Sequence, residues 1–535
     1  MRRAFSILLC TLVLVVACTA TPPASSTTGP IDPRQTTLMI GVGLEPQTFD
    51  PHVNIAEISS YRYHPNVYET LVQYAPDGTI KGLLADSWTI SADGLTYRFK
   101  LKPGVKFSDG TPFNAEAVKA NFDRVKTLNK GPVTLYAPIN QITPVDETTV
   151  DFVLKAPYAP LLAILAGWQS GLFISPTAWK TNDAGGGDLG QKWLNEHTAG
   201  TGAFTLESWK PNDRVTLVRN PNYREAVKAT DIQRIVYPLI AEPATRRQQM
   251  ASGDIDILEE LTPSIVDQLK GAPGVKVEVN FSVGSPFGQT VFMNLKKKPF
   301  DDVNVRRAIS YAIDYKRLVA VWNGLAVQAT GFFPDVFKPW FSGETVVYQQ
   351  DLTKAADYLR RAGLSMPMNP RLKFNVLWQA GQTSQRDMLQ LVKEDLAKIG
   401  IDLEVVSAEI PQWREAVWTK NYDMAIFQSA MRYADPDAIM SLVVHSSVYQ
   451  GQFNPGILDP AIDGLIEKGR ATADPAQRRT VYNDLQKILT DNAYLLYLVN
   501  KQQAWAYRTN VTGIVWNSNY GPRFNGNEIK KTSAK

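Results

Sequence analysis

The sequence has almost no excess of charge of either sign. Lys and Arg number 56 and Asp and Glu number 52, which leaves a formal net charge of +4 over 535 residues. Such an even mixture argues against a nucleic-acid partner and against a polybasic membrane-binding surface, so a small-molecule partner is expected. The chain is too long for a single core, and two or three structural units are expected.

Histidine is scarce, and the motifs of common enzymes are absent. The four histidines show no His-x-His or His-x3-His spacing of a metal site (His52, His64, His197 and His445). There is no Gly-x-Ser-x-Gly elbow, no phosphate-binding loop and no HExxH motif. We therefore expect no enzyme and no resident metal or cofactor. A metal bound through a small chelator stays an alternative, as does an extracytoplasmic hydrolase, which would need a nucleophile and a base that meet in a cleft.

Only two cysteines occur, Cys10 and Cys18, both near the N-terminus. Two arginines precede an apolar stretch of about 14 residues, 4–17, which is shorter than the roughly 20 residues that span a bilayer. This pattern is typical of an export signal. Residues 15–18, VVAC, resemble the lipobox of bacterial lipoproteins, which implies a signal peptide at 1–17, a lipid on Cys18 and attachment to the membrane through that lipid. The alternative is an ordinary signal peptide with an incidental cysteine.

Removal of residues 1–17 would leave one cysteine, which excludes a disulfide framework. The residues after Cys18 are rich in Thr, Pro and Ser and contain little that could be buried. We expect a disordered, lipidated tether at 18–37 and a folded body that starts near Leu38.

Local patterns predict the first elements of the folded body. Apolar residues alternate with others over 38–44 and again over 95–102, the period of half-buried strands. Asn114 is placed to cap a following helix. Residues 200–223 alternate around a Pro-Asn-Asp turn and predict a hairpin, and 302–324 has the apolar spacing of one helix.

The segment from 371 to 430 gives the clearest indication of topology. Strands are predicted at 371–379, 401–408 and 422–430, with a helix between each pair. Strands that alternate with helices imply right-handed crossovers and a parallel sheet, in an α/β fold. Ligands of such sheets bind beyond the carboxyl ends of the strands. Arg432 follows the third strand at that end, so it is a candidate site residue.

Five segments together resemble the peptide/nickel/opine class of extracytoplasmic solute-binding proteins that supply ATP-binding cassette importers. They occur in the order of that family and span nearly all of the mature chain. They are LTYRFKLKPGVKFSDGTPFNAEAVKANFDRV (95–125), GTGAFTLESWKPNDRVTLVRNPNY (200–223), ATRRQQMASGDIDI (244–257), FMNLKKKPFDDVNVRRAISYAID (292–314) and DMAIFQSAMRYADPD (423–437).

The resemblance implies a type II periplasmic-binding-protein (Venus-flytrap) fold, with two hinged lobes that close on a small organic solute. It also implies a monomeric capture receptor outside the cytoplasm, whose partner is an importer permease. The implied boundaries are 38–58, 189–283 and 501–530 for lobe I, 59–188 for an extra inserted domain and 284–500 for lobe II.

Arg432 occupies the position at which peptide-binding relatives have an aspartate that pairs with the amine of the peptide. A guanidinium would repel that amine, and it suits a carboxylate, a phosphate or sugar hydroxyls instead. Opine-like, oligosaccharide or amine-free peptide-like solutes are therefore expected beside ordinary peptides. The alternative is that Arg432 only forms a local ion pair with Asp435 or Asp437.

Other candidates are implied by the same resemblance. The backbone groups of Gln428, Ser429, Ala430 and Met431 would line the cleft. Trp413 and Trp378 would supply aromatic walls, although either could equally be ordinary core. Glu57 is the candidate from the opposite lobe, with an exposed loop glutamate as the alternative.

Overall fold

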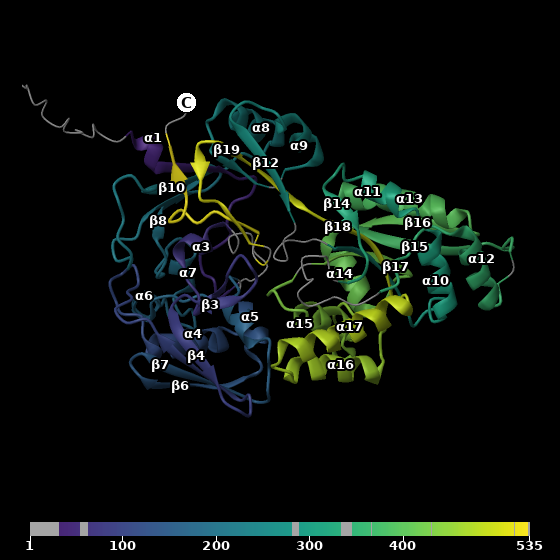
Figure 1. Cartoon of the computed structure of the whole chain (residues 1–535), viewed down its shortest axis with the longest axis horizontal. Coiled ribbons are helices and arrows are strands. Elements are labelled where there is room, and N and C mark those ends of the chain that lie inside the picture. Colours follow the sequence, from purple (N-terminus) through teal and green to yellow (C-terminus); the bar gives the residue numbers. More distant parts are fainter. Residues whose placement is uncertain are drawn as a thin grey trace, which may run out of the picture.

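The computed structural model describes residues 32–53, 62–168, 170–259, 261–280, 288–332, 345–364, 366–429, 431–517, 519 and 521–532. Within these residues the strands form three larger sheets, and Figure 1 shows two of them on one side of the molecule and the third on the other. Among the described helices, none has both the length and the apolar character needed to cross a membrane.

The largest sheet has seven strands. Its central strand β1 pairs in parallel with β10 and with β11, while the hairpin β8–β9 extends one side. The predicted hairpin is confirmed. The predicted first strand is confirmed too, but it ends at Gly41, and Leu44 is exposed. The strand order is β12 (Val275–Asn280), β19 (Gln503–Arg508), β11 (Ile257–Leu258), β1 (Thr37–Gly41), β10 (Arg234–Pro238), β9 (Arg214–Arg219) and β8 (Phe204–Lys210).

A four-stranded antiparallel sheet lies within residues 85–154, on the same side of the molecule (Figure 1). Its strand β5 buries Tyr97, Phe99 and Leu101 on one face, as the alternating pattern predicts. Helix α4 (Ala115–Leu128) packs on the sheet and begins at the predicted cap, where the Asn114 side chain accepts a hydrogen bond from the Ala117 amide at 2.9 Å. The strand order is β4 (Ala85–Ile90), β5 (Thr96–Leu101), β7 (Thr149–Leu154) and β6 (Ile139–Asp146).

The six-stranded sheet contains the predicted strand–helix–strand–helix–strand unit. Strands β15 and β16 are parallel to each other, and β17 is parallel to β15. Helices α13 (Thr383–Ala397) and α14 (Ile410–Thr419) connect them, so this prediction is confirmed. The strand order is β14 (Ala326–Gln328), β18 (Leu495–Lys501), β13 (Gly288–Met293), β17 (Met424–Ser429), β15 (Leu372–Gln379) and β16 (Ile401–Ala408).

The chain passes twice between the two largest sheets. Strand β12 of the seven-stranded sheet precedes β13 of the six-stranded sheet, and β18 of the six-stranded sheet precedes β19 of the seven-stranded sheet. Two crossings are what a pair of hinged lobes requires. The exact lobe and domain boundaries stay a prediction.

Two local predictions differ from the structure. The single helix expected over 302–324 is two helices, α10 (Val303–Ala312) and α11 (Tyr315–Ala320), because Ile313 is extended and the Asp314 side chain caps the second helix. The folded body begins before Leu38. Helix α1 (Pro33–Thr36) is capped by Asp32, and the Arg34 side chain donates to the Gly253 carbonyl at 2.5 Å.

Shorter elements complete the described fold. The two-stranded sheets are β2 (Val72–Tyr74) with β3 (Ile80–Gly82), β20 (Val511–Thr512) with β23 (Lys530–Lys531), and β21 (Val515–Asn517) with β22 (Gly521–Arg523). The remaining helices are α3 (His64–Val67), α5 (Leu161–Ala166), α6 (Pro176–Thr181), α7 (Gln191–Leu194), α8 (Pro243–Ser252), α9 (Pro263–Leu269), α12 (Leu352–Arg361), α15 (Asp437–Ile439), α16 (Pro460–Ala471) and α17 (Pro475–Asp491).

Candidate functional site

The two aspartates that follow Arg432 are buried and fully engaged by other groups. Asp435 accepts a hydrogen bond from the Nη2 atom of Arg478 at 2.6 Å, and both side chains are 3% exposed. Asp437 accepts from the Nε atom of Arg470 at 2.7 Å. The alternative that Arg432 forms an ion pair with Asp435 or Asp437 is therefore wrong, because helices α16 and α17 supply the cations instead.

Arg432 itself is exposed, and no hydrogen bond or ion pair joins it to another described residue. Partial desolvation by its surroundings lowers the pKa of Arg432, and neighbouring Tyr433 opposes that shift. The side chain stays charged at neutral pH, because the pKa of a guanidinium normally lies far above neutrality. A cation with five donors, none of them used by a described residue, is thus available at the carboxyl end of β17.

Arg432 lines a cavity of about 820 Å³ whose walls come from two separate parts of the fold. One wall is formed by residues 134–138 and 155–158, next to the four-stranded sheet, and the other by residues 418–471 beyond the six-stranded sheet. Aromatic and apolar side chains dominate, with a few charged groups among them, which is the usual composition of a small-molecule site. The aromatic members are Tyr158, Trp418, Tyr433 and Phe453.

A second cation faces this cavity from the other wall. Lys155 is exposed, and no described residue forms a hydrogen bond or ion pair with its ammonium group. The only carboxylate on the described walls of the cavity, Glu467, is already held by Arg470 and lies 3.1 Å from the Nε2 atom of His445. The unpaired charge of the described walls is therefore positive.

The loop that contains Arg432 is also tied to the opposite wall. The phenol of Tyr158 donates to the Oδ2 atom of Asp437 at 2.7 Å. Burial, reinforced by the Asp437 charge, raises the pKa of Tyr158, so the phenol remains a donor at neutral pH. Tyr74 donates to the Ala434 carbonyl at 2.9 Å. These two contacts hold the loop against Tyr158 of the opposite wall and against Tyr74 of β2.

Neither predicted tryptophan lines the cavity, although Trp413 contacts a residue that does. Trp413 is 3% exposed and stacks on Phe427 with ring centroids 6.5 Å apart. Its ring centroid also lies 6.2 Å from that of Phe453, which does line the cavity. Trp378 is half-buried against the core of the six-stranded sheet. The lining tryptophan is Trp418, which the sequence analysis did not single out.

Of the remaining predicted residues, the structure describes Gln428, Ser429 and Met431. Gln428 is half-buried and pairs with Gln289 across β17 and β13. The side chain of Met431 is 2% exposed within the core, so only its backbone could face a ligand. The backbone of Ser429 ends β17, whereas Ala430 and Glu57 lie outside the described residues. A role of these residues in binding stays a prediction.

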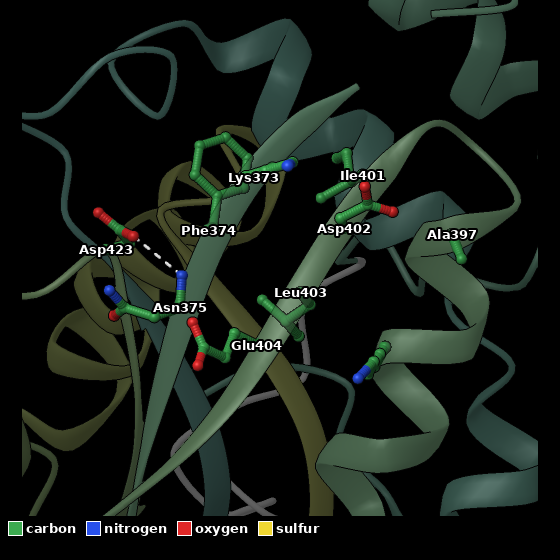
Figure 2. Close-up of a pocket in the computed structure, with 10 residues that line it drawn as sticks. Lys373, Phe374, Asn375, Ala397, Ile401, Asp402, Leu403, Glu404 and Asp423 are labelled. Atoms are coloured by element: carbon green, nitrogen blue, oxygen red, sulfur yellow. Dashed lines mark hydrogen bonds between the residues drawn. The ribbon is translucent and has the colours of Figure 1, made fainter. Parts of the chain in front are cut away.

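A second cavity of about 530 Å³ lies at the opposite end of the same strands. Figure 2 shows its lining residues on β15, β16 and α13. The backbone N–H of Asn375 donates a hydrogen bond to the Oδ2 atom of Asp423 at 2.9 Å. Asp423 is also paired with Lys297, and Asp402 with Arg371. This cavity lies at the amino ends of the strands, whereas ligands of such sheets bind beyond the carboxyl ends, so the edge with Arg432 is the better candidate.

The described residues contain no group of three or more His, Cys, Asp or Glu side chains arranged to hold a metal ion. A solute that brings its own metal would therefore depend on other contacts.

Comparison with known proteins gives matches over nearly the whole chain. The family model of bacterial extracellular solute-binding proteins, family 5 Middle, matches residues 79–451. The probable D,D-dipeptide-binding periplasmic protein DdpA of Escherichia coli (strain K12) is 31% identical over 502 residues, 92% of this chain and 94% of that protein. The glutathione-binding protein GsiB of Shigella flexneri is 27% identical over 496 residues, 89% of this chain and 91% of that protein. The structure of NikA from Brucella suis in complex with Fe(III)-EDTA covers 93% of this chain and all of its own, with a TM-score of 0.79 and 25% identity.

Proposed function

Because the chain belongs to the bacterial extracellular solute-binding proteins of family 5, we propose that it captures a small anionic organic solute and delivers it to an ATP-binding cassette importer. The predicted type II periplasmic-binding-protein fold is confirmed by the structural match to NikA. The predicted capture function is confirmed by the family and by its peptide-binding and glutathione-binding relatives. The anionic character of the solute is the new element.

The observation that supports an anionic solute is Arg432 on the wall of the 820 Å³ cavity, where no described residue pairs with it. Asp435 and Asp437, the nearest carboxylates in sequence, are used by Arg478 and Arg470. A solute carboxylate would therefore meet a guanidinium with free donors, and a hydrogen bond to a charged group contributes about 1.5–3 kcal/mol. Lys155 on the facing wall would add attraction from the second side.

An anion that touches both walls would favour the arrangement in which they are close together. Closure is shifted only by contacts that differ between the open and closed forms. Arg432 and Lys155 lie on opposite walls of one cavity, so an anion contacts both only when the walls face each other. This is the differential contact that a capture receptor needs.

We further propose that the protein acts outside the cytoplasm as a monomer, attached to the membrane by a lipid on Cys18. A signal peptide at 1–17 and a flexible segment after Cys18 would let the folded body reach solute while it stays near the importer. Replacement of Cys18 by Ala should move the protein from the membrane fraction to the soluble fraction. Retention in the membrane fraction would contradict the anchor.

The test of the solute class uses the protein from residue 19 to 535. Native mass spectrometry before and after denaturation identifies any co-purified solute. Calorimetry then compares N-acetyl-D-alanyl-D-alanine, which has a carboxylate and no amine, with its C-terminal amide. Arg432→Ala should weaken binding of the carboxylate by about 10- to 150-fold, the equivalent of 1.5–3 kcal/mol. Lys155→Ala should weaken it in the same direction but less, because Lys155 is a flexible, solvated point charge.

The control is Arg214→Ala, which removes an exposed arginine from the β8–β9 hairpin, where its one ion-pair partner among the described residues is Asp213. This variant should bind the carboxylate probe as the wild type does. A co-purified peptide with a free amine that is retained or bound more tightly by Arg432→Asp would contradict the proposal. So would equal binding of the carboxylate probe by wild type and Arg432→Ala.

A further inference from the structure

Three glutamines form a hydrogen-bonded chain at the carboxyl edge of the six-stranded sheet. The Nε2 atom of Gln385, on α13, donates to the Oε1 atom of Gln289, on β13, at 3.5 Å. The Nε2 atom of Gln289 donates to the Oε1 atom of Gln428, on β17, at 3.1 Å. Gln289 is 0% and Gln385 is 1% exposed, so water does not compete with the hydrogen bond between them.

The direction of this chain is set by a backbone group. The Oε1 atom of Gln385 accepts a hydrogen bond from the amide of Gln379, the last residue of β15, at 3.2 Å. A backbone N–H can only donate, so the Gln385 oxygen must face it and the Gln385 nitrogen must face Gln289. The same rule then orients Gln289 and Gln428, because a reversed amide would place one NH2 group against another and leave both donors without an acceptor.

This fixed orientation determines which atom Gln428, at the outer end of the hydrogen-bonded glutamines, can offer to a solute. The Oε1 atom of Gln428 is used by Gln289, and no described residue accepts a hydrogen bond from its Nε2 atom. Gln428 is half-buried at the end of β17, four residues before Arg432, so their α-carbons lie within about 14 Å of each other. Gln428 does not line the 820 Å³ cavity itself, but its NH2 group and the Arg432 guanidinium are both donors at the carboxyl end of β17.

We propose that Gln428 determines specificity as a donor-only residue, whose side-chain NH2 binds a carboxylate or carbonyl oxygen of the solute. Gln289 and Gln385 are positioning residues that prevent the Gln428 amide from turning its oxygen outward. This inference rests on the proposed function, since it adds a second anchor for the anionic solute beside Arg432. It selects against solutes that present an ammonium or amide NH2 group at this position.

Gln428→Glu is the variant that separates this role from a structural one. The glutamate has the same length and its carboxylate accepts the inward hydrogen bond from Gln289, so the chain of side chains is kept. The outward group changes from a donor to an anionic acceptor. Binding of N-acetyl-D-alanyl-D-alanine should fall by about 10- to 100-fold, whereas its C-terminal amide, which can donate to the new carboxylate, should bind equally well or more tightly.

Two further variants complete the test. Gln428→Met keeps the length and removes both donors, so it should weaken the carboxylate probe less than Gln428→Glu does. Gln268→Glu makes the same charge change on the exposed surface of α9 and should leave both probes unaffected. Thermal unfolding without ligand checks that the Gln428 variants remain folded. The expected signature is a reversed preference between carboxylate and amide, which a merely destabilised fold does not produce.

Binding of both probes by Gln428→Glu at the wild-type level, or an equal loss of both, would overturn the inference. The Arg432→Ala result distinguishes this failure from failure of the proposed function. If Arg432→Ala loses the carboxylate probe while Gln428→Glu retains it, only the role of Gln428 is refuted. If Arg432→Ala still binds the carboxylate probe, or if the wild type binds neither probe, then both the proposal of an anionic solute and the role of Gln428 are refuted.

Discussion

The most quantitative prediction concerns His64, a buried imidazole that must stay neutral in the folded protein. His64 is 1% exposed, and neither ring nitrogen has a hydrogen-bond partner among the described residues. Burial lowers the pKa of His64 to about 3, with Asp50 opposing the shift and His52 adding to it. His52, itself buried against Arg124, has its pKa lowered to about 4 for the same leading reason.

Proton linkage determines whether neutral His64 makes the protein more or less stable as the pH falls. An unfolded histidine has a pKa of about 6.5, so the unfolded chain binds a proton below that pH while the folded chain does not. The contribution of neutral His64 is fully present above pH 6.5 and is lost as the pH falls toward about 3. At pH 5 the unfolded histidine is about 1.5 pH units below its pKa, whereas at pH 7.5 it is almost unprotonated. At 1.36 kcal/mol per unit, proton binding therefore stabilises the unfolded state by about 2 kcal/mol between pH 7.5 and pH 5.

His64→Phe removes this titration and keeps a planar ring, which can still pack edge-on against Tyr68 as the imidazole does at 5.4 Å. Urea denaturation of variant and wild type at pH 7.5, 6 and 5 gives their difference in unfolding free energy. That difference should move by about 2 kcal/mol in favour of His64→Phe from pH 7.5 to pH 5. His197→Phe, which removes an exposed histidine, is the control for the loss of an imidazole. A difference for His64→Phe that stays constant with pH, or that moves no more than the difference for His197→Phe, would refute the reasoning.

Three other predictions concern the loop and its surroundings. Arg478→Met leaves the buried carboxylate of Asp435 without its cation and should lower the unfolding free energy by about 3–5 kcal/mol in urea denaturation. Burial lowers the pKa of Lys420 to about 8, so peptide mapping after brief acylation at pH 8 should find Lys420 modified ahead of the exposed lysines, and late modification would contradict that pKa. Tyr158→Phe removes the hydrogen bond to Asp437 and should weaken solute binding in calorimetry, while unchanged binding would mean that this contact does not support the binding-competent form.

Much of the fold was predictable because the relevant patterns are local. The parallel unit of β15, β16 and β17 follows from apolar periodicity between turn residues, and α4 starts at the Asn114 cap. The break at Ile313 was missed because the apolar spacing continues through it. Asp314, a residue suited to an N-cap, was the signal that could have revealed the second helix.

The candidate site was predictable only where one strand end defined it. Arg432 was found because it follows the carboxyl end of β17. Tyr158 and Lys155 were missed because they reach the cavity from a segment more than 270 residues earlier in the chain, through pairing that no local pattern encodes. The arginine nearest to Asp435 in the sequence is Arg432, and only the packing of α17 selects Arg478 as its partner.

The donors at this edge also bear on what would convert the protein into a receptor for peptides with a free amine. Arg432→Asp alone supplies the missing carboxylate but leaves Gln428 fixed with its NH2 outward, opposed to an ammonium group. Asp435 and Asp437 cannot compensate, because their oxygens are held by Arg478 and by Arg470 and Tyr158. The double variant Arg432→Asp with Gln428→Glu should therefore bind D-alanyl-D-alanine at least tenfold more tightly than Arg432→Asp does in calorimetry, whereas equal affinities would mean that Gln428 lies outside the reach of the solute.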